Sequence, residues 1–326
     1  MRSISLALLA GLVAGPALAD PLPSRNAGAT KSAIIDFVNA VTTPGSEAYV
    51  DPAERIATFD NDGNLWAEQP FYFQIQYALD TVKKMAAEDP SLVEKSPALK
   101  AAAEGDLEGV LAGGEKGLLE VIAISHSGMT TEEFKQSVAD WLAVTTHPGT
   151  GQPYNAMIYQ PMLELLSYLR ENGFKTYIVS GGGIDFVRVF SEQAYGIPPE
   201  QVVGSSIKAE YRIIDGKAVT AKLPELFFYD DKEGKPVAIN HHIGRRPLIA
   251  SGNSDGDLQM LEYATMGDRS GLAILLHHTD ADREWAYDRG SKIGNLDKAL
   301  DEASEQGWVV VDMKEDWRTV FPWELQ

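Results

Sequence analysis

The sequence contains no cysteine, so disulfide bonds, thiolate catalysis and cysteine-ligated zinc are all excluded. Beyond the N-terminal segment it also lacks any apolar run approaching the roughly 20 residues that a membrane-spanning helix needs. Basic residues are scarce: 28 Lys and Arg stand against 47 Asp and Glu, which gives a formal net charge of −19. Such an acidic surface argues against nucleic acid or an anionic membrane as a partner. A protein of this kind that accepts an anion therefore needs local positive charge at its site.

The N-terminal segment has the three parts of a secretory signal peptide. Arg2 precedes a short apolar run at 4–13, and the segment ends in Ala-Leu-Ala at 17–19. We expect cleavage after Ala19, a periplasmic or secreted location, and no membrane contact after cleavage. Removing residues 1–19, which carry one positive charge, leaves 307 of 326 residues and changes the charge from −19 to −20. A chain of that length can bury a core large enough to fold without disulfides.

A helical block follows the first predicted strand, which lies at 56–59. Apolar residues recur every three or four positions after it, which predicts an amphipathic helix; they are Phe71, Ile75, Leu79, Val82 and Met85. Helical signals continue to about residue 146 and include a capping box, Thr-Thr-Glu-Glu, at 130–133. We expect residues 70–154 to form an all-helical insert of the size of a small domain.

The remainder of the chain alternates strands with helices. Strands are predicted at 174–179, 247–250, 272–276 and 308–311, with helices at 184–195, 236–243, 258–264 and 296–305. This alternation indicates an α/β fold with a doubly wound parallel sheet. An Asp-Gly pair between apolar runs predicts a β-hairpin at 211–219. The expected core thus comprises residues 20–69 and 155–326.

Three predicted strands end in short polar turns that contain glycine, at 60–63, 180–183 and 252–257. The carboxyl ends of parallel strands share one edge of a sheet, so these turns can converge in one crevice. In the first turn Asp60 and Asp62 are one residue apart, and their charges repel unless a cation or a shared proton neutralises them. The alternative is a surface turn, since Asp, Asn and Gly are common turn residues.

Together these turns resemble the motifs of the haloacid dehalogenase superfamily, specifically its phosphatases. The first motif, Asp-x-Asp-Gly-Thr/Ser, is matched at 60–63, with Asn64 at the position that is usually Thr. The second, a strand that ends in Ser or Thr, is matched at 177–181, and the third, a lysine ahead of the last motif strand, by Lys235. The fourth, Gly-Asp-x-x-x-Asp, is matched at 252–257 with one substitution. The helical insert resembles the cap domain of the phosphoserine-phosphatase-like branch, on a Rossmann-like core.

The resemblance implies a phosphomonoesterase that forms an aspartyl-phosphate. Asp60 would attack phosphorus, and Asp62 would protonate the leaving oxygen and later deprotonate the attacking water. Ser180 and the backbone amide of Gly181 would hold phosphoryl oxygens, and Lys235 would offset their negative charge.

The resemblance also implies Mg²⁺ as cofactor. The cation would bind a carboxylate oxygen of Asp60, the backbone carbonyl of Asp62, and the fourth motif through Asn253 and Asp257. Asn253 stands where the family usually has a metal-binding Asp, so the site carries one negative charge less. We expect weaker binding of Mg²⁺ than a carboxylate would give, unless Asp255 or Asp257 compensates.

Other polar residues have plainer interpretations. Glu68 follows the first motif and is a candidate for binding a positively charged group on the substrate. Lys222 competes with Lys235 for the lysine role, but it directly follows the predicted hairpin and is interpreted as a solvated hairpin lysine. The histidine pairs at 241–242 and 277–278 are expected to be surface or packing residues, because adjacent side chains point to different faces and cannot easily share an ion.

We therefore predict a periplasmic, Mg²⁺-dependent phosphomonoesterase whose partner is a small phosphorylated molecule; the oligomeric state stays open. Phosphotransfer or phosphonate hydrolysis on the same fold is one alternative, although the Schiff-base lysine that phosphonate hydrolysis uses in this superfamily is not evident in the insert. The alternative of another class is an exported, non-catalytic protein that binds an anion or another solute. The Asp60 and Asp62 pair argues against it, because anion binding avoids carboxylates beside the ligand.

Overall fold

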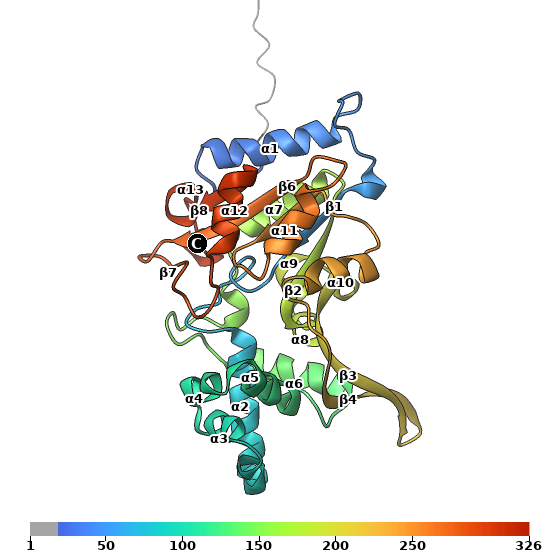
Figure 1. Ribbon diagram of the computed structural model, residues 1–326, viewed down its shortest axis with the longest axis vertical. Helices are drawn as coiled ribbons and strands as arrows, with labels where there is room; N and C mark the ends of the chain where they lie inside the picture. The colour runs from blue at the N-terminus through green and yellow to red at the C-terminus, as the bar shows by residue number, and fades with distance from the viewer. Residues whose placement is uncertain (1–18, 326) are drawn as a thin grey trace, which may run out of the picture.

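The computed structural model describes residues 19–325 (Figure 1). The predicted signal peptide, residues 1–19, lies outside the described residues apart from Ala19. Within the described part, no helix combines the length and the apolar character needed to cross a membrane.

An eight-stranded sheet forms the centre of the core, in the order β4-β3-β2-β1-β5-β6-β7, with β8 paired to β6. The parallel strands are β1 (Ile56–Phe59), β2 (Lys175–Gly183), β3 (Val202–Ile214), β5 (Ile249–Gly252), β6 (Leu272–Thr279) and β8 (Val309–Asp312). The antiparallel strands are β4 (Lys217–Phe228) and β7 (Ala286–Tyr287). The predicted α/β fold around a parallel sheet is confirmed.

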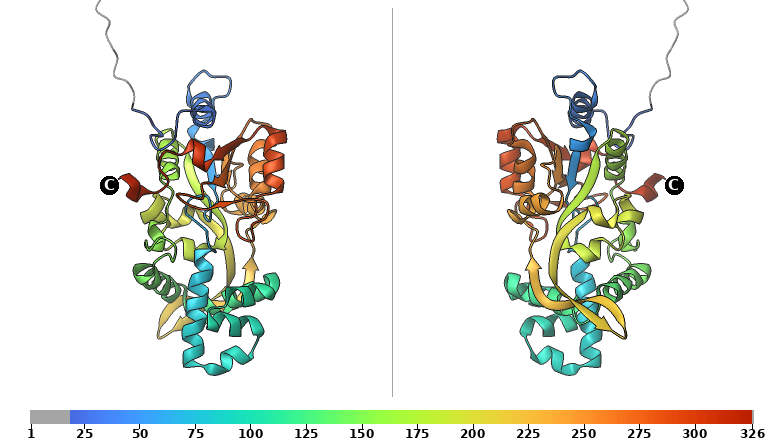
Figure 2. Two further views of the ribbon diagram at one scale, coloured as in Figure 1. Left: turned by 90° about the vertical axis from the view of Figure 1, so that its left-hand side faces the viewer. Right: turned by 90° about the vertical axis from the view of Figure 1, so that its right-hand side faces the viewer.

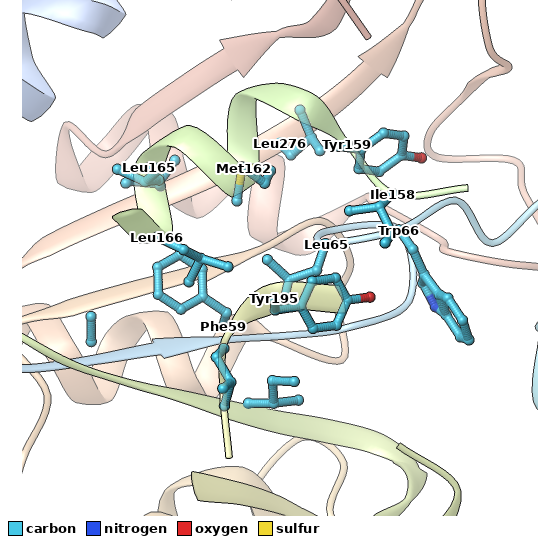
Figure 3. Packing of buried hydrophobic residues seen from close by; sticks show 14 of the residues in the cluster. Phe59, Leu65, Trp66, Ile158, Tyr159, Met162, Leu165, Leu166, Tyr195 and Leu276 are labelled. Atoms are coloured by element: carbon cyan, nitrogen blue, oxygen red, sulfur yellow. The ribbon is translucent and has the colours of Figure 1, made fainter. Parts of the chain in front are cut away.

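Helices cover both faces of this sheet (Figures 1 and 2). They are α1 (Ala29–Thr42), α7 (Gln160–Glu171), α8 (Ile184–Val187), α9 (Ser191–Tyr195), α10 (Gly234–His242), α11 (Leu258–Thr265), α12 (Lys298–Gln306) and α13 (Met313–Asp316). Two separate hydrophobic clusters result, because successive strand residues point to opposite faces. Ile178 joins the cluster under α1 and α7, whereas its neighbour Val179 joins the cluster under α10, α11 and α12. Figure 3 shows the first cluster, where Phe59 of β1 lies near α7.

One predicted helix is divided in two. The pattern at 184–195 predicts a single helix, but the chain forms α8 and α9 with a turn between them. The turn lets two aromatic rings pack on Trp66, with centroid distances of 6.5 Å for Phe186 and 4.5 Å for Phe190. The burial of both rings in one aromatic cluster therefore favours two short helices with a turn between them over one straight helix.

The predicted insert is built from helices and short turns. Its α-helices are α2 (Phe73–Glu88), α3 (Pro97–Glu104), α4 (Leu107–Ala112), α5 (Gly114–Ser125) and α6 (Thr131–Val144), together called the cap helices below. The helices α2 to α5 enclose a hydrophobic cluster of their own, which includes Ile75 and Leu79 of α2, whereas Phe134 and Val138 of α6 belong to the first cluster of the core. The capping box is present: Thr130 and Glu133 exchange hydrogen bonds at the start of α6. The domain boundaries themselves stay a prediction.

The hairpin of β3 and β4 is longer than predicted. Its turn is the expected Asp215-Gly216 pair, whose φ angles of 50° and 75° suit a tight hairpin turn. Pairing continues from this turn back to Ser206 and Phe228, so the hairpin runs down beside the cap helices (Figures 1 and 2). There the amide of Lys222 donates to the carbonyl of Met129 at 2.9 Å. The cap helices and the hairpin thus lie together below the carboxyl edge of the sheet.

Candidate active site

The first aspartate turn is tied firmly to the neighbouring strand. Asp60 follows β1, and its amide donates to the carbonyl of Ser251 in β5 at 2.9 Å. Asn64, the residue in place of the usual Thr, donates from Nδ2 to the carbonyl of Asp60 at 3.1 Å and accepts from Ser251 Oγ at 2.8 Å. Gly63 has φ 72°, which favours glycine. The turn therefore holds Asp60 and Asp62 in defined positions.

Lys235 at the start of α10 reaches into this turn. Its Nζ lies 2.9 Å from Asp60 Oδ1 and 2.6 Å from Asp257 Oδ1, and it donates to the carbonyl of Val179 at 3.0 Å. Burial alone lowers the pKa of Lys235, but Asp257 and Asp60 more than reverse this effect and raise it above its ordinary value. The ammonium group therefore stays charged beside Asp60.

The two aspartates of the turn lie in different environments. Burial and the charge of Asp257 raise the pKa of Asp60 well above its usual range, while Lys235 opposes the rise. Burial raises the pKa of Asp62 to about 6, against a hydrogen bond of 2.8 Å from Trp66 Nε1 to Asp62 Oδ1. Asp60 is thus paired with a lysine, whereas Asp62 has a pKa suited to giving and taking a proton.

The second turn meets the cap helices. Ser180 is fully buried and accepts from the amide of Gly182 at 3.0 Å, while Gly181 lines the cavity described below. The amide of Gly183 donates to Gln74 Oε1 of α2 at 2.7 Å. The segment 180–183, predicted as a turn, is the end of β2 itself, with a shift in its pairing with β3 between Ser180 and Gly183, and it lies beside the start of α2.

The two aspartates of the fourth motif have different hydrogen-bond partners. Asp257 Oδ1 faces Lys235, and its Oδ2 accepts from the amides of Asn253 at 2.9 Å and Ser254 at 3.1 Å. Asp255 Oδ1 instead accepts from the amides of Asp297 at 2.9 Å and Ala299 at 3.0 Å, at the start of α12. Asp257 is therefore engaged by an ammonium and two amides, and Asp255 is engaged by two amides at the start of α12.

Glu68 lies against Asn253 of the fourth motif. Asn253 Nδ2 donates to Glu68 Oε1 at 2.8 Å, and the hydroxyl of Tyr287 donates to the same oxygen at 2.8 Å. Glu68 also lines the cavity, so its predicted contact with a substrate group stays a prediction. In the described part of the chain, Asn253 Oδ1 is buried without a hydrogen-bond partner.

The oxygen atoms at this edge of the sheet fit Mg²⁺. Asp60 and Asp257 contact the ammonium of Lys235, and Asp62 and Glu68 lie close enough to Asp60 to interact with it, so four carboxyl groups stand beside one ammonium. Over residues 19–325, no three Asp, Glu or His side chains converge as a ready-made metal centre. Asp60, the carbonyl of Asp62 and the unpartnered Oδ1 of Asn253 offer carboxylate, carbonyl and amide oxygens, which is a ligand set that Mg²⁺ accepts.

A cavity of about 200 Å³ opens from the aspartate turn toward the cap helices. Its polar lining includes Gln74, His126, Asp185 and Lys222. The apolar and aromatic residues of its wall are Tyr72, Ile75, Leu118, Leu119, Ile122, Phe134, Ile184, Phe186, Ile207, Leu226 and Tyr229. These residues come from α2, α5, α6, α8 and the hairpin, so the cap side of the cavity suits a group with apolar surface.

The interpretation of Lys222 as a solvated lysine is wrong. Only 5% of its surface is exposed, its Nζ forms an ion pair with Asp185, and it lies 4.7 Å from the ring centre of Phe134. The reason is that the hairpin folds back onto the cap helices. Lys235 contacts Asp60, whereas Lys222 lies in the wall of the cavity.

The histidine pairs are structural or exposed. His241 and His242 are exposed on α10, while His278 is buried and its ring stacks on that of Tyr287. His278 also bonds through Nε2 to the carbonyl of Gly63 at 2.7 Å. It thereby supports the aspartate turn from behind.

Sequence reasoning missed Gln74 and His126. Gln74 Nε2 lies 2.7 Å from His126 Nε2, and Ser125 Oγ lies 2.8 Å from His126 Nδ1. Burial lowers the pKa of His126 to about 3, so the ring is neutral. The sequence offered one signal for Gln74, because this polar residue lies next to the apolar face of the predicted helix.

Comparison with known proteins agrees with these motifs. A family model for haloacid dehalogenase-like hydrolases matches residues 57–262. No curated protein matches the chain. A conserved protein of unknown function from Anaerococcus prevotii DSM 20548 is similar over 85% of this chain and 88% of its own, with 17% identity and a TM-score of 0.51. A protein of unknown function from Bordetella pertussis Tohama I is similar over 80% of this chain and 99% of its own, with 16% identity and a TM-score of 0.51.

Another solved structure, a phosphoserine phosphohydrolase-like protein from Francisella tularensis, aligns over 68% of this chain and 87% of its own, with 18% identity and a TM-score of 0.39. At their identities the first two structures, each with a TM-score of 0.51, support the fold alone. The family model covers more than half of the chain, and its match includes all four motifs. The chain therefore belongs to the haloacid dehalogenase-like hydrolase family, as its motifs predicted.

Proposed function

We propose that this protein is an exported, Mg²⁺-dependent phosphomonoesterase that transfers a phosphoryl group from a small substrate to Asp60 and then to water. The observation that carries the proposal is the pairing of Asp60 with Lys235 at 2.9 Å, with Asp62 two residues on, at the inner end of the cavity. The signal-peptide pattern at residues 1–19 supports the export.

In the first step an oxygen of Asp60 attacks phosphorus, and the bond from phosphorus to the leaving oxygen breaks. Asp62 gives its proton to that leaving oxygen. In the second step Asp62 takes a proton from water, which attacks the phosphorus and releases phosphate from Asp60. A pKa of about 6 allows Asp62 to act as acid and then as base near neutral pH.

Several groups would hold the phosphate during both steps. Lys235 offsets negative charge, and the amides of the 181–183 turn lie at the cavity wall. Mg²⁺ would be held by Asp60, the carbonyl of Asp62 and Asn253 Oδ1, and would neutralise charge on the phosphoryl oxygens. These groups supply the positive charge that the acidic surface lacks.

The apolar wall of the cavity favours a leaving group with apolar surface. In a site that is dry and apolar, a strongly polar leaving group loses its hydration without gaining equivalent partners. We therefore expect a small alkyl or aryl phosphomonoester to be a better substrate than a polymer.

The structure gives the phosphonate alternative little support. The lysines of the cap helices are all exposed and none lines the cavity: Lys83, Lys84, Lys95, Lys100, Lys116 and Lys135. The one cavity lysine besides Lys235, Lys222, comes from the hairpin and is paired with Asp185. Phosphotransfer and simple binding remain to be separated from hydrolysis by experiment.

The deciding experiment assays protein that begins at Asp20 on p-nitrophenyl phosphate, with Mg²⁺ and with EDTA. Inorganic phosphate is measured beside nitrophenol, because transfer to another acceptor releases nitrophenol alone. Asp60→Asn should lose activity by about 10³-fold or more, since it removes the nucleophile. Asp255→Asn is the matched control, because its side chain bonds to the start of α12. Metal-independent release, or full activity in Asp60→Asn, would exclude the proposed mechanism.

A further inference from the structure

The fourth motif departs from the family pattern at Asn253, and the side chain that meets this residue is Glu68. Asn253 Nδ2 donates to Glu68 Oε1 at 2.8 Å, and only 1% of each residue is exposed. A carboxylate accepts hydrogen bonds and does not donate them, so the amide nitrogen must face Glu68. The bond therefore turns Asn253 Oδ1 to the opposite side.

That oxygen is the atom left without a partner. In the described part of the chain Asn253 Oδ1 is buried and accepts no hydrogen bond. A buried polar atom without a partner is costly, and native proteins retain such atoms where a ligand or an ion completes them. Asn253 Oδ1 is therefore available as a ligand for a cation.

Glu68 brings a negative charge to the place where the usual Asp is missing. Its hydrogen-bond partners are Asn253 and Tyr287, and none of the ion pairs found among residues 19–325 involves it. A buried carboxylate without a basic partner is strongly unfavourable unless a cation lies nearby. A cation bound at Asn253 would therefore stabilise, one hydrogen bond away, the negative charge that Asn253 lacks.

The surrounding backbone leaves room for this carboxylate. Gly63 and Gly294 have φ angles of 72° and 63°, and a Cβ atom on either residue would overlap Glu68 Oε1. Two turns from distant parts of the chain therefore need glycine at these positions to make room for the same oxygen.

We propose that Glu68 is the positioning residue of the magnesium site: it orients Asn253 so that Oδ1 faces the cation, and it supplies the negative charge of the missing aspartate. The inference rests on the Mg²⁺ dependence in the proposed function. Asp257 and Asp255, the residues first considered for compensation, are engaged by Lys235 and by the start of α12. In this role Glu68 acts on the cation rather than on a charged group of the substrate.

The test measures Mg²⁺ affinity by isothermal titration calorimetry without substrate. Glu68→Gln removes the charge and lets either end of Asn253 face the cation, so the Kd for Mg²⁺ should rise by about 10- to 100-fold. In Glu68→Gln/Asn253→Asp the glutamine amide donates to a new carboxylate at the ligand position. This double variant should return to within about threefold of the original Kd.

Tyr287→Phe is the matched control. It removes the second hydrogen bond to Glu68 Oε1 and keeps both the charge and the bond to Asn253, so its Kd should stay within about threefold. Circular dichroism checks the fold of each variant. If Glu68→Gln does not fold, Glu68→Asp replaces it, since the shorter side chain keeps the charge but cannot reach Asn253, and a rise of about tenfold is expected.

Three results would overturn the proposal: unchanged affinity in Glu68→Gln, a double variant no better than Glu68→Gln, or an equal loss in Tyr287→Phe. An original protein that binds no Mg²⁺ would overturn it as well. Because no substrate is present, these results are separate from the phosphatase assay. A protein with the expected binding pattern and no phosphatase activity would contradict the proposed function and leave the role of Glu68 standing.

Discussion

At the residue scale, two opposing influences act on the pKa of Asp62, the proposed proton-transfer group. Burial raises the pKa of Asp62 to about 6, while the hydrogen bond from Trp66 Nε1 favours the charged form. The indole also stacks on Phe190 with ring centres 4.5 Å apart, so it packs in the core and bonds to Asp62 at once. Trp66 therefore sets how readily Asp62 releases its proton.

Trp66→Phe should move the pH dependence to higher pH. The variant loses the hydrogen bond to the charged form, so the pKa of Asp62 rises further. Because the protonated form is the proton donor, the decline of kcat/KM with rising pH should begin about 1 pH unit higher, as a hydrogen bond of about 1.5 kcal/mol implies. The measurement is a pH profile from about 5 to 9 with an alkyl phosphate, whose leaving group needs the proton.

Phe190→Leu is the control for this change, because it alters the packing of Trp66 and leaves the bond to Asp62 in place. Its profile should stay where it is. A shift to lower pH in Trp66→Phe, or the same shift in both variants, would contradict the assignment.

At the element scale, α2 links the cap helices to the second turn. Gln74 Oε1 accepts from the amide of Gly183, and Gln74 Nε2 donates to the neutral ring of His126 at the end of α5. One side chain thus joins the end of β2 to two cap helices. The hydrogen bonds of Gln74 lie in the wall of the cavity, where they fix the distance between the cap helices and the second turn.

Gln74→Leu should weaken substrate binding more than turnover. The variant leaves the amide of Gly183 and the ring of His126 without this partner, and the second turn is then held less firmly. We expect KM to rise about tenfold, which corresponds to about 1.4 kcal/mol, with a smaller change in kcat. Steady-state kinetics on p-nitrophenyl phosphate provides the measurement.

The matched control is Gln76→Leu on the same helix, where the amide bonds to Asp80 and does not contact the core turn. It should leave KM nearly unchanged. Equal effects of the two substitutions would mean that the stability of α2, rather than its link to the turn, controls binding.

At the scale of the whole molecule, the negative net charge opposes the binding of an anionic substrate, which the proposed function requires. The chain is strongly acidic, with a net charge of −19, yet its site must accept an anion. Around Lys235 the fold gathers the carboxyl groups of Asp60, Asp62, Asp257 and Glu68. A divalent cation that binds only the folded state would relieve this excess and so stabilise the entire molecule.

Mg²⁺ should therefore raise the melting temperature. At a free concentration of about 100 times Kd, binding adds about 2.7 kcal/mol to the free energy of unfolding. For a chain of this size that corresponds to a rise of about 4 °C. Differential scanning calorimetry with MgCl₂, compared with NaCl of equal ionic strength, measures the effect. The same rise in NaCl would show that only screening is involved.

The sequence by itself determined the features that depend on neighbouring residues. The strand before Asp60, the capping box at Thr130 and the turn at Asp215 follow from propensity and hydrogen bonding within a few positions. The alternation of strands and helices predicted a parallel sheet and placed the motif turns at one edge. That was enough to identify the family and to predict Lys235 beside Asp60.

Only the tertiary structure decided the contacts between distant parts of the chain. Glu68 meets Asn253 across 185 positions, and the hairpin folds back far enough to bury Lys222 against Asp185. The division of α8 from α9 likewise depends on the packing of Phe186 and Phe190 against Trp66. No local pattern contains this information, because the environment of a side chain depends on which distant segments the fold brings against it. Whether a polar residue such as Lys222 is solvated or buried therefore depends on the segment that packs against it.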